Sequence, residues 1–134
     1  MSTPRALMLL AEAYAMLGQP VEGLNCLAEA AQIIETTEER IGEAELHRMR
    51  GDLLYAMGDL AEAQQSYHHA LTVAERQSVK LFELRAAMGL ARLCRDQGKR
   101  TDARALLAPI YGWFTEGFDT TVLQDAKTLL DQLT

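Results

Sequence analysis

The chain has 134 residues, the length of one small domain or of one segment of a longer array. Its 13 Lys and Arg residues against 19 Asp and Glu residues give a net charge of −6, which argues against a surface for nucleic acids or anionic membranes. The 20 Ala and 21 Leu residues far outnumber the four Val and four Ile residues, and this composition favours helices over strands. We therefore expect an all-α protein and exclude a fold built on a sheet.

The two cysteines, Cys26 and Cys94, lie far apart and have no His or Cys partner at metal-ligand spacing. We predict that both are reduced and buried as small apolar residues. The chain shows no basic leader followed by an apolar core, and no apolar run reaches the roughly 20 residues of a membrane-spanning helix. We therefore expect a cytoplasmic protein with no metal, no cofactor and no membrane contact.

An internal repeat organises the sequence. Gly18, Gly58 and Gly98 recur with a constant period of 40, and each follows a stretch whose apolar residues are three and four positions apart. Other positions repeat with the same period. Small residues lie seven positions before each glycine (Ala11, Gly51, Ala91) and five after it (Gly23, Ala63, Ala103), and large apolar residues lie nine after it (Leu27, Tyr67, Leu107). We predict one domain over residues 1–134, built from three helix–turn–helix units at about 4–38, 40–78 and 79–116.

The apolar periodicity predicts six helices around the three glycines, over residues 4–17, 20–35, 40–57, 60–76, 79–97 and 101–115. The residues that support helix starts are Pro20 at a first helical position, Thr36 with Glu39 and Asp59 with Glu62 at capping-box spacing, and Ser78 as a candidate N-cap.

A last amphipathic stretch over about 119–133 follows the third unit. Its apolar face carries Val122, Ala126, Leu129, Leu130 and Leu133, and its other face is polar. A helix with one apolar and one polar face can close an open core on one side and meet water on the other. We predict a C-terminal capping helix that ends the array of repeats.

These positions resemble the tetratricopeptide repeat family, whose pattern places small residues, a turn glycine and an aromatic residue at fixed positions. The residues that match are Gly51, Leu54, Gly58, Ala63, Tyr67 and Ala70 in the second unit, and Ala11, Tyr14, Gly18, Gly23, Leu27 and Ala30 in the first. The period of 40 exceeds the usual one of about 34, and Glu35, Glu75 and Thr115 replace the closing Pro. The resemblance implies an α-solenoid of three antiparallel helix hairpins plus the capping helix.

The stretches 43–51, 85–87, 90–93 and 106–120 are also similar to the C-terminal helical-repeat tails of large bacterial regulatory proteins with a nucleotide-cyclase-like or NTPase domain. That resemblance implies a regulatory or sensor segment of a larger protein. No catalytic residue of such a protein is expected here, because the chain has no phosphate loop and no metal-binding carboxylate pair.

No motif of a nucleophilic or cofactor-dependent enzyme occurs, so we predict that the chain is not an enzyme. His68 and His69 are adjacent on a helix and point about 100° apart, so they cannot both bind one metal ion and are expected at a solvated edge. His47 is expected to be a partly buried packing residue rather than a ligand. The aromatic residues expected to pack in the core or cap are Tyr14, Tyr67, Trp113 and Phe114.

In the family's register, the first helix of each unit lines a concave groove. Three arginines and a methionine follow one another at steps of three, four and three on one face of the third unit's first helix: Arg85, Met88, Arg92 and Arg95. Arg48 holds the position in the second unit that Met88 holds in the third. Such a stripe suits the capture of carboxylates. The alternative is a solvated face whose charge is compensated by Glu45, Asp52 and Asp96.

The predicted partner-binding groove comprises Arg48, Met49, Asp52, Arg85, Met88, Arg92 and Arg95. The first helices also carry Met8, Met16, Met49, Met57 and Met88, which are either adaptable groove residues or core filler. The clamp with which some family members hold the C-terminal tail of a chaperone is not expected. Its positions are occupied by Met8, Glu12, Met49, Arg85 and Gly89, of which only Arg85 fits.

We therefore predict a non-catalytic protein–protein interaction module that binds a protein or peptide segment, with a preference for acidic ones, in the concave groove of a helical solenoid. The alternatives are the regulatory segment described above and, less favoured, a module that binds a small ligand in an apolar cavity.

The N-terminal helix is apolar nearly all round, because Glu12 is its only charged residue between positions 6 and 17. A helix of that kind is normally enclosed on every side. Either further repeats precede it, or two chains cover it by pairing. We favour an origin in a longer array, and as its consequence we expect a homodimer of the isolated chain through a surface formed by Leu7, Met8, Leu9 and Leu10.

Overall fold

The computed structural model describes residues 3–37, 40 and 42–134, and this part of the chain forms seven helices and no strand. The helices are α1 (Pro4–Met16), α2 (Pro20–Thr37), α3 (Glu43–Ala56), α4 (Leu60–Gln77), α5 (Lys80–Asp96), α6 (Arg100–Gly112) and α7 (Thr121–Gln132). The prediction of an all-α fold is confirmed. None of the described helices is both long and apolar enough to cross a membrane.

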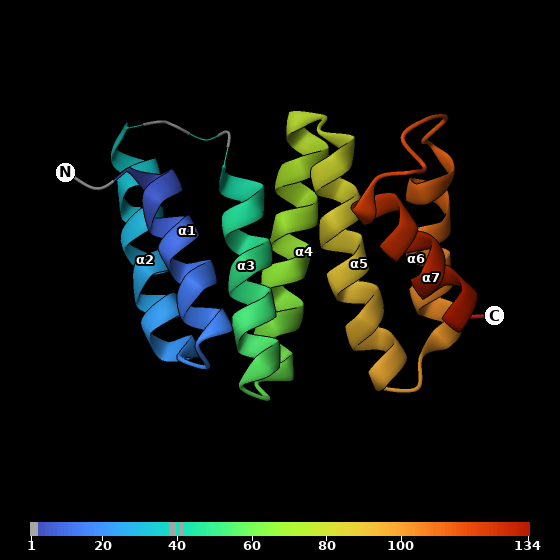
Figure 1. The fold of residues 1–134 in the computed structure, drawn as a ribbon, viewed down its shortest axis with the longest axis horizontal. Coiled ribbons are helices and arrows are strands. Elements are labelled where there is room, and N and C mark those ends of the chain that lie inside the picture. Colours follow the sequence, from blue (N-terminus) through green and yellow to red (C-terminus); the bar gives the residue numbers. More distant parts are fainter. Residues whose placement is uncertain (1–2, 38–39, 41) are drawn as a thin grey trace.

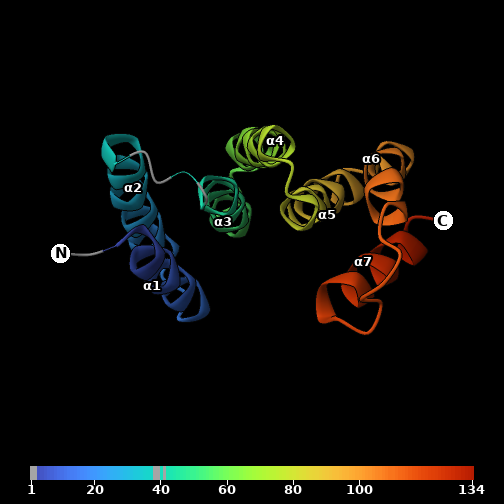
Figure 2. The same ribbon diagram turned by 90° about the horizontal axis from the view of Figure 1, so that it is seen from above.

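The helices form three antiparallel hairpins, α1/α2, α3/α4 and α5/α6, which stand side by side in chain order (Figure 1). Viewed from above, the hairpins follow a curved row in which α1, α3 and α5 line the inner side and α2, α4 and α6 the outer side (Figure 2). The helix α7 packs on α5 and α6 and projects, like α1, toward the inner side. The architecture is therefore the expected α-solenoid with a C-terminal capping helix.

Each hairpin turns at one of the three repeat glycines. Gly18, Gly58 and Gly98 have φ values of 73°, 84° and 79°, in the left-handed region that glycine adopts without a steric penalty. At each turn the N–H group of the next residue donates to a carbonyl oxygen in the last turn of the preceding helix, at 2.8 to 2.9 Å. This closure is typical of a helix C-terminus that ends on glycine, and it confirms the predicted turns.

Two of the expected helix-start signals are present. Pro20 is the first residue of α2. The Asp59 carboxylate caps α4 by accepting a hydrogen bond from the Glu62 N–H at 3.3 Å. At the start of α1, for which the sequence suggested no cap, the Thr3 hydroxyl accepts from the Ala6 N–H at 3.1 Å.

Two other signals were wrong. Ser78 does not begin a helix: it ends α4 in a left-handed conformation with a φ of 59°, and α5 starts after Val79 without a side-chain cap. Thr36 lies inside α2, where its hydroxyl donates to the carbonyl oxygens of Gln32 and Ile33, so it caps nothing. Its expected partner Glu39 lies outside the described residues.

Two helix bounds also differ from the prediction. The third helix begins at Glu43 rather than at residue 40, because Gly42 is its N-cap. The sixth helix ends at Gly112 rather than at residue 115. There the N–H groups of Trp113 and Phe114 donate to carbonyl oxygens three positions back, which tightens and terminates the helix.

Tyr67 of α4 fills the space between α3 and α5. Its side chain is only 2% exposed, and its ring lies against two helix glycines. A Cβ atom added to Gly51 or Gly89 would lie 2.7 or 2.4 Å from the Tyr67 Cε1 atom. Both glycines are thus required for the close approach of α3, α4 and α5, and Tyr67 has the packing role expected for it.

The capping helix buries the predicted apolar face. Leu123, Ala126, Leu129 and Leu133 are buried in one core cluster with Leu84 and Leu107, while Val122 and Leu130 pack at its margin. Phe114 packs against the same cluster. Trp113 does not, because its side chain is 58% exposed and lies near the Lys80 ammonium group.

Candidate binding groove and its charge network

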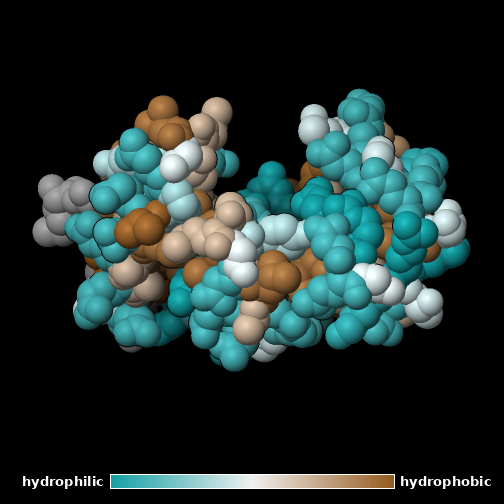
Figure 3. Space-filling view, turned by 90° about the horizontal axis from the view of Figure 1, so that it is seen from below, coloured by the Kyte–Doolittle hydropathy of each residue, from teal (hydrophilic) through white to brown (hydrophobic). Residues whose placement is uncertain are grey.

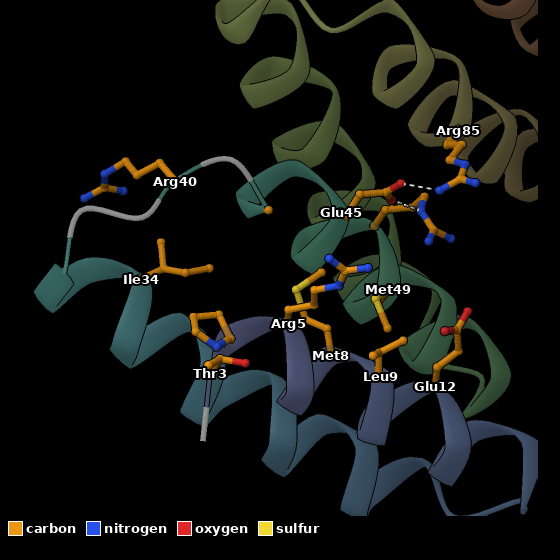
Figure 4. A pocket seen from close by; sticks show the side chains of 13 residues that line it. Thr3, Arg5, Met8, Leu9, Glu12, Ile34, Arg40, Glu45, Met49 and Arg85 are labelled. Atoms are coloured by element: carbon orange, nitrogen blue, oxygen red, sulfur yellow. Dashed lines mark hydrogen bonds and ion pairs between the residues drawn. The ribbon is translucent and has the colours of Figure 1, made fainter. Parts of the chain in front are cut away.

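The inner face is hollowed between α1 and α3. An open cavity of about 690 Å³ lies there, and Figure 4 shows Met8 and Leu9 of α1 facing Met49 of α3 across it, with Glu45 and Arg85 at one end. The remaining lining residues are Thr3, Pro4, Arg5, Glu12, Ile34, Arg40, Gly42 and Arg48. The cavity therefore combines an apolar wall with charged side chains at several points of its rim.

The side chain of Met49 helps to explain why this junction is open. Met49 in α3 occupies the same repeat position as Gly89 in α5. Because Gly89 has no side chain, the ring of Tyr67 can pack tightly against its backbone. In the first hairpin the position of Tyr67 is occupied by Leu27, which is smaller and is buried in the core cluster of the first two hairpins. Accordingly α1 contacts α3 far less than α3 contacts α5.

Two further hollows adjoin the cavity. One, of about 340 Å³, continues between α1 and α3 toward the Gly18 turn, and the other, of about 310 Å³, lies between α1 and α7 over α3 and α5. Glu12 and Arg48 line all three hollows. The inner face thus carries one extended groove rather than an isolated pocket.

Glu45 is the centre of a charge network on the floor of this groove. Its carboxylate accepts a hydrogen bond from the Arg48 Nε–H group and another from an Arg85 terminal N–H group at 2.6 Å. The Glu45 side chain is only 11% exposed, so this pairing occurs largely away from water. It holds two of the predicted arginines in place.

The network continues from Arg48 to Tyr67. A second Arg48 N–H group donates to Asp52 at 2.9 Å, and the Tyr67 hydroxyl donates to the other oxygen of the same carboxylate. Burial lowers the pKa of Arg48, but the Glu45 and Asp52 carboxylates outweigh this and raise it above its ordinary value. Burial, and then Asp52, raise the pKa of Tyr67, so that its hydroxyl stays a donor.

The remaining two arginines of the stripe differ from each other. Arg95 pairs with Asp96 at 3.1 Å and donates to the Gln132 side chain at 2.7 Å, which ties α5 to the capping helix. Arg92 is half-buried and forms no ion pair or hydrogen bond within the described residues. It lies in the hollow between α1 and α7, where Asp125 also lines the wall.

Six of the seven predicted groove residues line the three adjoining hollows, and Arg95 lines a smaller hollow beside Arg92. Arg48, Asp52, Arg85, Met88 and Arg92 line hollows of the inner face, and Met49 lines the cavity. Met88 is only 4% exposed, because most of its side chain packs in the core. The stripe is not a purely positive patch, because Glu45, Asp52 and Asp96 pair with three of its arginines. Of the other methionines, Met8 lines the cavity, and Met16 and Met57 are exposed near helix ends.

The two arms of the inner face differ in polarity. Apolar side chains gather over the arm formed by α1, whereas the arm formed by α7 is hydrophilic, with the hollow between them (Figure 3). The large apolar residues exposed on α1 and at the start of α2 are Leu9, Leu10, Met16, Leu17 and Val21. Leu7, which was expected in a self-association surface, is only 5% exposed because it packs in the core of the first hairpins, and Met8 is half-buried beside it.

Sequence reasoning named Glu45 only as a possible compensating charge and missed that it bridges two helices. The signal was the repeat itself. Arg5, Glu45 and Arg85 stand at the same position of successive repeats, so the fold places them at equivalent points of α1, α3 and α5. Opposite charges at one repeat position of neighbouring units thus meet in the pair of Glu45 with Arg85, whereas Arg5 forms no ion pair with Glu45.

A histidine pair was also missed. The His47 and His69 rings stack, with centroids 3.8 Å apart and an interplanar angle of 22°. Burial, and then the neighbouring His69, lower the pKa of His47 to about 4, so its ring is neutral at pH 7. Both histidines line a separate hollow of about 480 Å³ between α2 and the α3/α4 hairpin. His68 and His69 are exposed, as expected for a helix edge.

The sequence matches the model of the tetratricopeptide repeat family over residues 2–76 and 42–111. The chain belongs to this family, whose repeats generally mediate protein–protein interactions and are typically non-catalytic. No curated protein matches the chain.

Proposed function

We propose that the chain is a non-catalytic module that holds a segment of a partner protein along its inner face. The observation that carries this proposal is the extended groove, in which three adjoining hollows share Glu12 and Arg48. An extended groove fits a peptide or a helix better than a compact ligand does, because side chains along a segment can enter successive hollows. A small apolar ligand would fit the largest cavity by volume alone and would leave the charged floor unused.

The partner segment combines apolar anchors with carboxylates. Met8, Leu9 and Met49 offer an apolar wall that suits leucine, methionine or aromatic anchors. Arg48 and Arg85 are already paired with Glu45. The acidic preference therefore rests chiefly on Arg92 and on Arg5, which lines the cavity and forms no ion pair within the described residues. Because charge pairs at such half-open sites are worth at most about 1 kcal/mol each, the affinity is modest and falls with added salt.

The experiment selects short peptides on the wild-type chain from a random displayed library and measures their affinities by titration calorimetry. Two variants with the same charge change are compared: Arg92→Glu on the inner face and Arg104→Glu on the outer helix α6. The proposal expects selected peptides with apolar and acidic residues, a several-fold loss of affinity for Arg92→Glu, and little change for Arg104→Glu. Equal affinities in both variants, or no selected peptide, would contradict it.

We also propose that the isolated chain self-associates through the exposed apolar face of α1. Leu9 and Leu10 are 58% and 46% exposed there, next to each other and beside other apolar residues of the same arm. Sedimentation velocity over a concentration series tests this. The variant is Leu10→Glu, because Leu10 is exposed and does not line the cavity, and the matched control is Leu60→Glu at an exposed leucine of α4. Wild type and Leu60→Glu should dimerise and Leu10→Glu should not; a monomeric wild type at high concentration defeats the proposal.

A second candidate role is that of a regulatory segment in a larger cyclase-like or NTPase protein of bacteria. Its support is the resemblance of stretches 43–51 and 106–120 to such tails. The natural reading frame around the coding sequence distinguishes this role from that of a stand-alone adaptor.

A cytoplasmic location is part of either proposal. Its support is the pair of free thiols, Cys26 and Cys94, whose pKa values are raised by burial. Both cysteines are half-buried rather than fully buried as expected, because each packs at the margin of a core cluster.

A further inference from the structure

The hairpin of α3 and α4 brings three metal-ligating side chains together on a surface that the partner groove does not use. His47 precedes the turn glycine Gly58 by as many positions as His69 follows it, so the antiparallel helices place them at the same level. Glu43 lies four positions before His47, one turn away on the same face of α3. The two helices therefore present Glu43, His47 and His69 to one another.

The geometry points to a site for a transition-metal dication, Zn²⁺ being the best fit, formed by Glu43, His47 and His69. One ligand atom from each of the three residues lies within 4.8 Å of the other two. Within the described residues neither imidazole forms a hydrogen bond, so a ring nitrogen of each is available. His69 is exposed and Glu43 is half-buried, which leaves the cluster open to ions from solution.

A modest rearrangement converts this cluster into a coordination site. Bonds of about 2.0 to 2.1 Å to a tetrahedral zinc ion place the ligand atoms roughly 3.3 Å apart, so the side chains must move inward by about 1 Å. The stacked rings must also turn about their side-chain torsions, because two nearly parallel rings do not aim at one point. An exposed His69 side chain can make that turn without disturbing the core.

The chemistry of the three ligands selects the ion. Two imidazole nitrogens and one carboxylate form an established zinc ligand set, which leaves a fourth position for water or for a group of another molecule. Magnesium and calcium prefer sites made only of oxygen ligands. Copper(II) would bind at least as tightly in vitro, as the general order of metal affinities requires.

Two arginines face the cluster and oppose a cation. Arg40 lies 3.4 Å from the Glu43 carboxylate and is half exposed, so this weak pair can be displaced. Arg50 donates to the Ser66 hydroxyl at 2.7 Å and lies 4.0 Å from Glu62, which compensates part of its charge. The bound ion would link α3 to α4 and so stabilise the hairpin, since the unfolded chain holds no such site.

Zinc titration of the untagged chain by calorimetry tests the proposal, with thermal unfolding as the second readout. The matched pair is His69→Asn and His68→Asn, two exposed neighbours of which only one belongs to the cluster, and Glu43→Gln is a further variant. We expect one zinc ion per chain, at least tenfold weaker binding for His69→Asn and for Glu43→Gln, and unchanged binding for His68→Asn. At free zinc 100-fold above the dissociation constant, the melting temperature of wild type should rise by about 8 °C.

Three results would overturn the assignment. These are an absence of zinc binding by the wild type, equal affinities of His69→Asn and wild type, and a loss for His68→Asn as large as that for His69→Asn. Because the variants change exposed or half-buried polar residues, all of them should fold, and their melting curves without zinc verify this.

Discussion

The two junctions along the inner face are built from the same repeat positions and yet pack differently. Between α3 and α5, Gly51 and Gly89 admit the ring of Tyr67, and the helices close tightly on it. Between α1 and α3, Met49 stands where Gly89 would be, and a cavity of about 690 Å³ remains. The difference teaches that two repeat positions, occupied by Met49 rather than Gly89 and by Leu27 rather than Tyr67, can leave the surface between neighbouring hairpins open.

The same comparison shows which charged side chains of the groove are already paired within the protein. Asp52 accepts hydrogen bonds from both Arg48 and the buried Tyr67 hydroxyl, and it also lines the hollow between α1 and α3. At the border with the open junction Glu45 holds Arg48 and Arg85 on the rim of the cavity. A partner carboxylate would therefore have to compete with Glu45 for these arginines, and this makes Glu45 a restraint on acidic ligands.

The largest expected effect on the free energy of unfolding comes from placing a side chain at Gly89. Gly89→Ala gains up to about 1 kcal/mol of helix propensity. The new Cβ atom, however, would lie 2.4 Å from a ring that is 2% exposed and cannot move aside. Because the clash outweighs the gain, we expect the free energy of unfolding to fall by about 2 kcal/mol, measured by chemical denaturation.

The control for this change is Gly112→Ala. Gly112 is the last residue of α6, and no atom lies within 4 Å of the position of its added Cβ. This variant should be neutral or slightly more stable than wild type. A Gly89→Ala chain as stable as Gly112→Ala would show that Tyr67 does not require the glycine.

Glu45→Gln should act on stability and on binding in opposite directions. Loss of the carboxylate removes two charge-assisted hydrogen bonds and should cost about 1 to 2 kcal/mol of unfolding free energy, moderated by the exposure of Arg85. It also frees Arg85 and leaves Arg48 paired only with Asp52, so acidic peptides selected on wild type should bind a few-fold more tightly. Glu35→Gln on the outer helix α2 makes the same charge change as a control. An affinity gain of equal size in both variants would point to net charge rather than to local competition.

Tyr67→Phe should have the smallest effect. The phenylalanine ring still fills the space between Gly51 and Gly89, and only the hydrogen bond to Asp52 is lost. Because Asp52 is about half exposed and water can replace the hydroxyl, the loss should be about 1 kcal/mol in denaturant titrations. Tyr14→Phe, whose hydroxyl has no partner within the described residues, should change stability by less than about 0.5 kcal/mol. If Tyr67→Phe and Tyr14→Phe changed stability equally, the hydrogen bond from Tyr67 to Asp52 would not contribute to the stability of the closed junction.

Most of the fold could be predicted because it repeats. The period of 40 located Gly18, Gly58 and Gly98, and these fixed the turns and the helices on either side of them. Ser78 misled because its local chemistry suits a helix start, whereas the chain needed a left-handed residue there to end α4. Local capping preference therefore gave way to the requirement of the tertiary turn.

The site was less predictable because a stripe on one helix says nothing of what faces it. Helical spacing placed Arg85 and Arg92 on one face, but the partner of Arg85 lies on α3, one full repeat earlier. Met88 has the right spacing and does line the hollow between α1 and α7, but it offers little surface there, since it packs in the core cluster to which the capping helix contributes Leu123. The contact between Glu45 and Arg85 can be predicted from the sequence if equivalent positions of neighbouring repeats are compared, since these two residues are 40 positions apart.

The most direct test of the central claim is to map a selected peptide onto the chain by chemical-shift changes in ¹⁵N–¹H NMR spectra. The account predicts that the largest changes fall on the cavity-lining residues of α1 and α3 and extend to Arg92 of α5, while α2, α4 and α6 change little. Changes concentrated on the outer helices, with the α1/α3 cavity unaffected, would contradict the assignment of the inner groove as the partner-binding surface.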